Sequence, residues 1–226
     1  MKFLIQTIDG KVVHDFAITL IEAIRYSNWL YKTSDFEYIE SETIDGYIGC
    51  VPVGSVEFVT EYTKHFFDID LKPINVPDIL MDKQYSGRNI FNGTNKDIKS
   101  KSFVKSMDKI KSFTEITNEA PPGNYQISDF IEIESEYRCF VYKNELIGLQ
   151  NYSGDFKLFP DIKKIEEMIS VYSETSPRAY TLDVAILDNN ETIVVEVHDF
   201  FSCGLYGFSD LQKLPLMFYS WYNEIF

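Results

Sequence analysis

Two acidic side chains and a histidine interrupt a pair of otherwise apolar segments near the end of the chain. Residues 181–187 read TLDVAIL and residues 192–199 read TIVVEVHD. Apolar residues dominate both, as in β-strands, and the polar exceptions are Asp183, Glu196 and His198. Carboxylate oxygens are the ligands that a hard cation such as Mg²⁺ prefers, and histidine also binds divalent metals. A divalent cation bound between the two carboxylates, with the histidine nearby, is therefore one interpretation of this pattern.

The connection between the two segments predicts how they pair. Residues 188–191, DNNE, are a strong turn signal. If the central two asparagines form a two-residue loop, Asp183 lies directly across the hairpin from Glu196, and His198 lies on the diagonal. The opposite face would then hold the apolar residues Leu182, Val184, Ile186, Ile193, Val195 and Val197. Facing carboxylates destabilise a sheet unless something compensates them, so a metal site, an acid–base dyad and a solvated acidic face are the three interpretations.

Basic side chains in the preceding segments could meet phosphate groups at such a site. Lys105 ends the apolar run SFVK, Lys111 lies in KIKSF, and Arg138 lies inside EYRCFVY. Cations of this kind stabilise a phosphoryl group during its transfer. A buried arginine requires a partner, so the alternative for Arg138 is an ion pair with Glu136 or another acid. The alternative for each lysine is a solvated side chain.

The elements that must position these residues mix strands with helices. Apolar periodicity predicts strands in FLIQTI, SFVKSM and YQISDFIEI, and a hairpin in EYRCFVYKNELIGLQNY that turns at Lys143–Asn144. It predicts helices in VVHDFAITLIEAIRYSNWLY, FPDIKKIEEMISVYSE and LPLMFYSWYNEIF. Strand and turn structure is expected over residues 37–60, a loop-rich connection over 68–101, and a loop over 114–124. Antiparallel hairpins mixed with helices indicate an α+β fold.

Charge and composition exclude several classes of protein. A net charge of −14 argues against binding nucleic acid through a broad basic face and against docking on anionic membranes. No apolar run reaches the ~18 residues needed to span a bilayer, and the N-terminus lacks the apolar core of a signal peptide. The cysteines, Cys50, Cys139 and Cys203, are far apart and form no CxxC pair, so we expect buried, reduced thiols. These features predict a soluble cytoplasmic protein.

The order of the motifs resembles the ATP-grasp superfamily, and most closely the small ATP-grasp proteins of phages and bacteria. The segments that carry the resemblance are FVKS, IKSF, YQISDFIEIESEYRCFVYKNELIG, NYSGD, YTLDVAI and ETIVVEVHDFFSCGLYGF. The resemblance implies an ATP-grasp domain over residues 85–226, in which two α+β lobes clasp ATP, preceded by an N-terminal α/β subdomain over residues 1–84. It also implies ATP- and Mg²⁺-dependent joining of a carboxylate to an amine through an acylphosphate, with a peptide or protein as one substrate class.

The resemblance assigns roles to particular residues. The metal ligands would be Asp183, Glu196 and His198, with the histidine standing where the family has asparagine; Asp199 could supply an oxygen instead. Lys105 and Arg138 would be the catalytic cations. The residues that contact ATP would be Lys105, Lys111, Asp129, Phe130, Ile131, Glu136, Arg138 and Arg88. Among these, the segment Asp129–Ile131 would be the hinge that reads adenine.

Departures from the family pattern leave other functions open. Ser106 and Glu115 replace the usual proline and glycine near the two lysines. The resemblance also implies that Ser202 and Tyr206, in the segment SCGLYGF, would contact substrate. Besides a ligase, the sequence allows a degenerate ATP-grasp fold that binds nucleotide or a protein partner without ligating, and a phosphotransferase on the same scaffold. The products distinguish them: an amide with ADP, nothing, or a phosphorylated acceptor with ADP.

Overall fold

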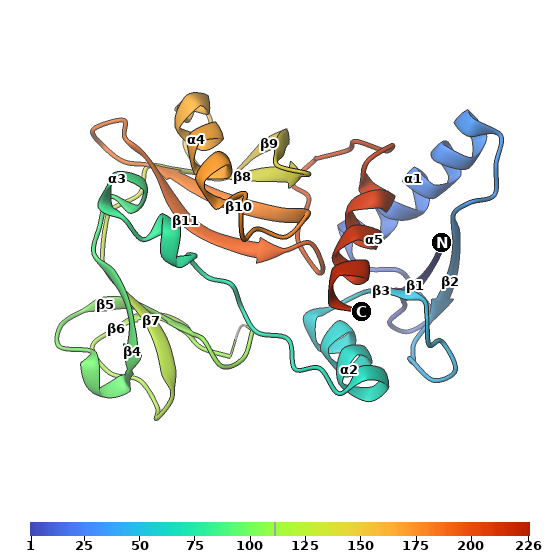
Figure 1. The fold of residues 1–226 in the computed structure, drawn as a ribbon, viewed down its shortest axis with the longest axis horizontal. Helices are drawn as coiled ribbons and strands as arrows, with labels where there is room; N and C mark the ends of the chain where they lie inside the picture. Colours follow the sequence, from blue (N-terminus) through green and yellow to red (C-terminus); the bar gives the residue numbers. More distant parts are fainter. Residues whose placement is uncertain (111) are drawn as a thin grey trace. The chain divides into compact units, whose positions relative to one another are not determined.

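The computed structural model describes residues 1–110 and 112–226, which form two compact units (Figure 1). The first unit consists of Met1–Leu71, Pro177–Ala179 and Phe200–Phe226, and the second of Lys72–Ser176 and Tyr180–Asp199. These units divide the chain differently from the predicted boundary at residues 84 and 85, which stays a prediction. The last helix returns to the first unit, where it packs against the N-terminal elements.

The first unit is a small parallel sheet with three helices. Its strands follow the order β2-β1-β3, and its elements are β1 (Lys2–Gln6), β2 (Glu37–Ser41), β3 (Val51–Val53), α1 (Asp15–Tyr31), α2 (Val56–Phe67) and α5 (Leu214–Ile225). The expectation of strand and turn over 37–60 is wrong after residue 55, because Ser55 caps α2 by accepting a hydrogen bond from the Phe58 amide at 3.2 Å. Phe58, Val59 and Tyr62 then form the buried stripe of a helix.

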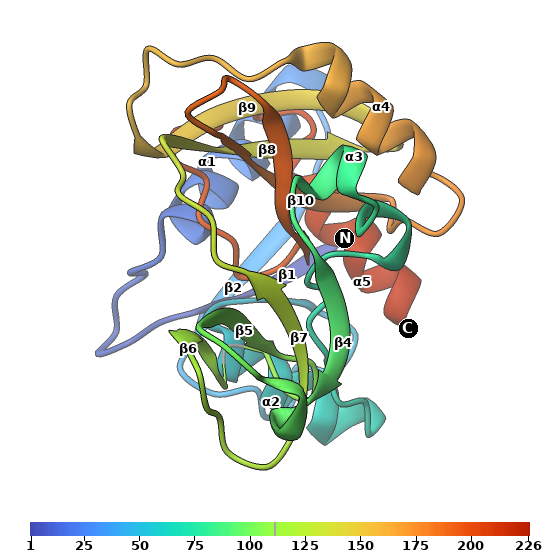
Figure 2. The ribbon, with the colours of Figure 1, turned by 90° about the vertical axis from the view of Figure 1, so that its left-hand side faces the viewer.

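The second unit contains two antiparallel four-stranded sheets, which Figure 2 shows as separate layers. The first has the order β11-β10-β8-β9, with strands β8 (Ser135–Tyr142), β9 (Glu145–Gly154), β10 (Ala179–Ile186) and β11 (Thr192–Asp199). The second has the order β4-β7-β5-β6, with strands β4 (Ile90–Thr94), β5 (Ser102–Ser106), β6 (Thr114–Thr117) and β7 (Asn124–Asp129). Mixed helices and antiparallel sheets confirm the predicted α+β class.

Several local expectations for the second unit need correction. The region 68–101 is more regular than predicted, since it holds η1 (Asp78–Leu80), α3 (Lys83–Ser86), β4 and η2 (Asn95–Asp97). The expected loop over 114–124 begins with β6, which pairs with β5 although its side chains are mostly exposed and give no apolar signal. The strand in YQISDFIEI ends at Asp129, where the chain leaves one sheet for the other. The hairpin turn at Lys143–Asn144 is confirmed, with φ of +53° and +64°.

The main core of the second unit lies between one face of the first sheet and α4 (Ile162–Tyr172). Asp161 caps this predicted helix, and its carboxylate accepts from the Lys163 amide at 2.9 Å. Ile165, Met168 and Ile169 then pack against apolar residues of β10 and β11. Among the described parts of the chain, no helix combines the length and the apolar composition needed to cross a membrane.

The β10–β11 hairpin has the predicted pairing at Asp183, but its loop and its register differ from the prediction. Asp183 pairs with Glu196, as expected. The loop is longer than predicted, however, because Leu187 donates its amide to the carbonyl oxygen of Glu191 at 3.0 Å and so leaves residues 188–190 between them. A bulge next to Asp183 leaves Val195 of β11 as an extra residue without a cross-strand partner on β10. This extra residue offsets the longer loop and restores the pairing of Asp183 with Glu196.

The bulge also changes which apolar residues share a face. The predicted face included Ile193 and Val195, but Val194 pairs with Val184 and lies with Val197 in the core shared with α4. Val195 instead lines a small cavity on the opposite side of the strand. The expectation for Ile193 and Val195 is therefore wrong, because an extra residue reverses the alternation of the strand before it.

Candidate active site

Arg138 and Asp183 form the most deeply buried ion pair at the predicted site. Arg138 lies on β8 and Asp183 on the neighbouring β10, and their side chains are 9% and 1% exposed. The guanidinium is bidentate, with Nε donating to Oδ1 at 2.8 Å and Nη2 to Oδ2 at 2.7 Å. The expected ion pair of Arg138 with an acid is therefore present, and the acid is a predicted metal ligand rather than Glu136.

Glu196 lies between a lysine and a histidine. Its carboxylate forms an ion pair with the ammonium of Lys105, which reaches it from β5 of the other sheet. Its second oxygen, Oε1, lies 2.5 Å from Nε2 of His198 on the same strand. The pKa of Lys105 is lowered to about 7, mainly because burial disfavours the charged form; Asp183 and Glu136 oppose this shift, and the nearby positive charge of Arg88 adds to it. The interpretation of Lys105 as a solvated surface lysine is wrong, since its side chain is 8% exposed.

The three predicted metal ligands do converge. Asp183, Glu196 and His198 each present a ligand atom within 4.8 Å of the others. Two carboxylates suit a hard cation such as Mg²⁺, whereas the imidazole nitrogen is a more typical ligand of transition metals. The donor set therefore fits a divalent cation, with both carboxylates also held by cationic side chains. The interpretation of a fully solvated acidic face is wrong for Asp183, which is buried.

A small cavity adjoins the lysine. It has a volume of about 10 Å³, room for a water molecule, and is lined by Arg88, Phe103, Lys105, Gln126, Ser128 and Val195. The ammonium of Lys105 also lies 5.0 Å from the centre of the Phe103 ring. This space is smaller than a nucleotide.

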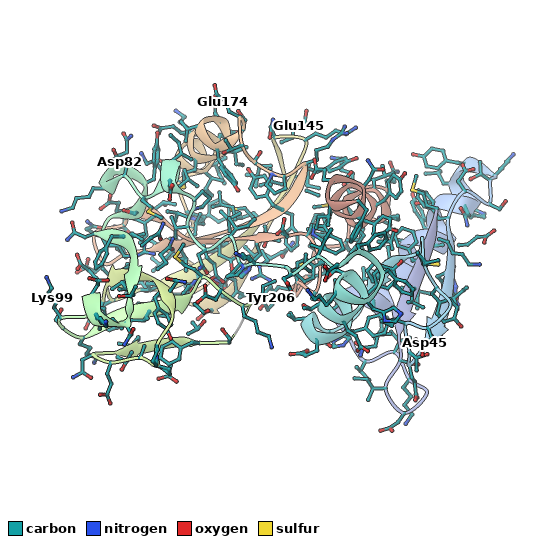
Figure 3. All side chains as sticks on the ribbon, turned by 60° about the horizontal axis from the view of Figure 1, so that its bottom comes forward. Asp45, Asp82, Lys99, Glu145, Glu174 and Tyr206 are labelled. Carbon is teal, nitrogen blue, oxygen red and sulfur yellow. The ribbon has the colours of Figure 1, made fainter. Side chains whose placement is uncertain are left out.

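Arg88 supports the bulge in β11. Its Nη1 donates to the carbonyl oxygens of Ser86 at 3.0 Å and Val194 at 2.8 Å, and Nη2 lies 3.5 Å from that of Val195. A bulge leaves strand carbonyls without ladder partners, and the guanidinium satisfies these. Asp82, labelled in Figure 3, caps the short α3 that precedes Arg88. The predicted contact of Arg88 with ATP stays a prediction.

The predicted adenine hinge lies where the chain passes from β7 to β8. The Asp129 carboxylate accepts hydrogen bonds from the backbone and side-chain nitrogens of Asn89 at 3.1 and 2.5 Å. Phe130 is half exposed, with Lys101 Nζ 5.1 Å from its ring centre, and Ile131 follows. These residues join the two sheets, as a hinge would.

Four further residues of the predicted site are Lys111, Ser202, Tyr206 and Glu136. Lys111 is outside the described residues. Ser202 and Tyr206 belong to the first unit, where the Ser202 hydroxyl donates to the carbonyl oxygen of Gly54 at 2.5 Å and Tyr206 is half exposed (Figure 3). Glu136, on β8, accepts a hydrogen bond from the Tyr152 hydroxyl at 2.7 Å. Their proposed contacts with ATP or substrate stay predictions.

Sequence reasoning missed two amide side chains beside the cluster. Asn75 and Gln126 are both buried, at 5% and 5% exposure, and both bridge between segments of the second unit. Gln126 alternates with the apolar residues of β7, which could have marked it as an inward polar residue. Asn75 lies in a polar, loop-like region, and no local pattern distinguishes it.

A family model for the ATP-grasp domain, R2K clade family 2, matches residues 85–215. The chain belongs to this ATP-grasp family. A search of the curated proteins finds no significant match. The family model covers β5, β8, β10 and β11, and with them every residue of the ion-pair cluster.

Solved structures share the ATP-grasp fold at low sequence identity. D-alanine–D-alanine ligase from Bacillus anthracis, complexed with ATP, has a TM-score of 0.52 and 11% identity, covering 99% of this chain and 97% of that one. The macrocyclase MdnC from Microcystis aeruginosa MRC, bound with precursor peptide MdnA, has a TM-score of 0.52 and 12% identity, covering 96% and 99%. N5-carboxyaminoimidazole synthetase from Staphylococcus aureus has a TM-score of 0.54 and 11% identity, covering 97% and 78%. These similarities confirm the predicted ATP-grasp fold.

Proposed function

We propose that this protein is an ATP- and Mg²⁺-dependent ligase that joins a carboxylate to an amine through an acylphosphate. One observation carries the proposal: cations from β5 and β8 converge on acids of β10 and β11. Lys105 and Arg138 supply positive charge for phosphate groups, and Asp183 and Glu196 supply oxygens for a divalent cation. Membership in the ATP-grasp family supports the assignment.

The proposed reaction has two steps. A carboxylate oxygen of the substrate attacks the γ-phosphorus of ATP, and the bond from phosphorus to the bridging oxygen breaks as ADP leaves. The amine nitrogen then attacks the acyl carbon of the acylphosphate, the carbon–oxygen bond to phosphate breaks, and the nitrogen loses a proton. The products are an amide, ADP and phosphate. The first step spreads negative charge over the phosphoryl oxygens, and the second places it on the oxygen of a tetrahedral intermediate; the protein's contribution would be mainly to stabilise these charges.

The ion pairs of the present structure would be exchanged in the complex. Lys105 would leave Glu196 for a phosphate of ATP, and Arg138 would turn part of its guanidinium from Asp183 toward the transferred phosphoryl group or the acylphosphate. Asp183 and Glu196, with His198 or Asp199 beside them, would hold Mg²⁺, which neutralises phosphate oxygens when bound. Each buried charge keeps an opposite partner before and after the exchange, which limits the cost of desolvation.

The proposed substrate class is supported by two solved structures of the same fold. One solved structure of this fold is a macrocyclase bound with a precursor peptide, and another is a ligase named for D-alanine. We therefore propose a carboxylate and an amine of amino-acid type, with peptides and proteins as the first candidates. Ser202 and Tyr206, on a segment with positive φ at both residues, are the proposed substrate contacts.

The first test is calorimetric titration with ATP and with ADP, each with and without Mg²⁺. We expect Mg²⁺-dependent binding of ATP, weakened at least about tenfold in Asp183→Asn, Glu196→Gln and Lys105→Met. Glu191→Gln, an exposed acid at the tip of the same hairpin, is the matched control and should bind as the wild type does. Absence of ATP binding by the wild-type protein would refute the ligase function.

Product analysis then separates the ligase from its alternatives. A mixture of ATP, Mg²⁺ and candidate peptides should yield ADP, phosphate and a product lighter than its substrates by one water. A phosphorylated acceptor with ADP would instead indicate a phosphotransferase. Binding of ATP with no product from any substrate would favour a nucleotide-binding module that does not ligate.

A further inference from the structure

A buried asparagine joins the two strands that carry Lys105 and Glu196. The backbone carbonyl oxygen of Asn75 accepts a hydrogen bond from the Val197 amide at 2.7 Å, and Val197 lies between Glu196 and His198. The side-chain Nδ2 of Asn75 donates to the carbonyl oxygen of Ser106 at 3.0 Å, and Ser106 directly follows Lys105. One residue therefore contacts the neighbour of each partner in the ion pair.

The next residue is held just as tightly. Gln126 accepts from the Val76 amide through Oε1 at 2.9 Å and donates to the Val76 carbonyl oxygen through Nε2 at 2.9 Å. Gln126 is also the cross-strand partner of Lys105. Residues 75–76 are thus hydrogen-bonded to both sheets of the second unit beside the ion pair.

Asn75 adopts a backbone conformation that few other residue types adopt readily. Its φ is +55°, in the left-handed region that asparagine and glycine adopt more readily than other residues. Its side chain is buried with the donor satisfied, so an apolar replacement would leave the Ser106 carbonyl oxygen without this partner. Both the backbone and the amide of Asn75 are used.

We propose that Asn75 is a positioning residue that sets the placement of Lys105 relative to Glu196. The inference rests on the proposed function for its catalytic meaning: Lys105 would bind phosphate and Glu196 would bind the cation. A fixed spacing between β5 and β11, the strands that carry them, would make nucleotide and Mg²⁺ bind cooperatively. Without the Asn75 amide, β5 and β11 can shift relative to each other. The cooperativity between nucleotide and Mg²⁺ should then fall more than the stability of either strand does.

The decisive experiment is a double-mutant cycle that needs no ligand. Lys105→Met, Glu196→Gln and the double variant are unfolded with urea in the wild-type background and again in Asn75→Gly. Glycine keeps the positive φ and the carbonyl oxygen that accepts from Val197, and removes the buried side chain together with its bond to Ser106. Because the cycle measures the coupling between two side chains, a general loss of stability does not alter it.

We expect the wild-type cycle to show coupling of at least about tenfold in the unfolding equilibrium constant. Asn75→Gly should reduce that coupling at least about threefold. Asn190→Gly is the matched control, an exposed asparagine with φ of +64° in the β10–β11 loop, and should leave the coupling unchanged. Equal coupling in the wild-type and Asn75→Gly backgrounds, or no coupling in either, would overturn the proposal.

A second measurement connects the geometry to the proposed function. The ratio of ATP affinities with and without Mg²⁺ should fall at least about tenfold in Asn75→Gly and stay unchanged in Asn190→Gly. An unchanged ratio in Asn75→Gly would contradict the cooperative role. If the wild-type protein binds no ATP, the proposed function fails, and the urea cycle still decides whether Asn75 positions the pair.

Discussion

Arg138 holds both carboxylate oxygens of Asp183 at 2.8 and 2.7 Å, so a predicted phosphate-binding cation and a predicted metal ligand pair with each other. The arginine was expected to face phosphate and the aspartate a metal ion. Their direct pairing means that a ligand of either must compete with the other. It also gives the fold a buried, charged contact between β8 and β10 whose loss can be measured.

The Arg138–Asp183 pair predicts a large asymmetry in stability. Arg138→Met leaves a carboxylate buried without its partner, so the free energy of unfolding should fall by about 3–5 kcal/mol. Arg138→Met combined with Asp183→Leu should recover most of that loss, because no charge remains buried. Urea denaturation checks both. Lys164→Met, which removes a pair with the half-exposed Glu167, is the control and should cost less than about 1 kcal/mol.

The support that Arg88 gives to the β11 bulge predicts a specific effect of substitution. Arg88→Lys keeps the charge but cannot reach three carbonyl oxygens in the same geometry, so the free energy of unfolding should fall by about 1–3 kcal/mol. ATP binding should weaken too, because Glu196 follows the bulge directly. Arg25→Lys is the control, since Arg25 is exposed and donates a hydrogen bond to the Tyr38 hydroxyl at 2.7 Å. Equal stability of the two variants would contradict the role of Arg88.

Gly154 ends β9 where no side chain fits. A Cβ there would lie 2.1 Å from the backbone oxygen of Glu134, and φ is +77°. Gly154→Ala should lower the free energy of unfolding by at least about 2 kcal/mol more than Gly46→Ala. Gly46 has a similar φ of +80° with open space around it, so its variant reports the backbone strain alone. Thermal or urea unfolding of the pair separates the steric clash from the strain.

Burial predicts how the thiols respond to pH. It raises the pKa of Cys139 well above the ordinary thiol value, and raises that of Cys50 as well, with Lys2 opposing the shift at Cys50. The thiolate is the reactive form, so the folded protein should react slowly with a thiol reagent at pH 8. In the urea-unfolded protein, all three cysteines are exposed to the reagent and should react quickly. Fast labelling of Cys139 in the folded protein would refute this.

The same shift has a consequence for stability. A thiol whose pKa is higher in the folded state binds its proton there more tightly, so its stabilising contribution is complete below the unfolded pKa of about 8.5 and is lost as pH rises above it. The free energy of unfolding should therefore decline between pH 8 and 9.5. Cys139→Ala should show a shallower decline over that interval, measured by urea unfolding at each pH.

The sequence by itself determined most strands and helices of the second unit and the identity of the charged residues. Alternation marked β10 and β11, and an acid among apolar residues marked Asp183 and Glu196 as exceptions. Helix periodicity with an aspartate cap marked α4. The strands β4 and β6 and the helix α2 were missed. The mostly exposed residues of the two strands carry little apolar signal, and a serine such as Ser55 does not by itself mark the start of a helix.

Only the tertiary structure decided how the charged residues meet. The predicted pairing of Asp183 with Glu196 is correct, but it arises from a longer loop offset by a bulge, each shifting the register by one residue. The bulge is supported by Arg88, and the spacing to β5 is bridged by Asn75. Both residues are about a hundred positions away from β11 in sequence, and local periodicity carries no information about such distant hydrogen bonds.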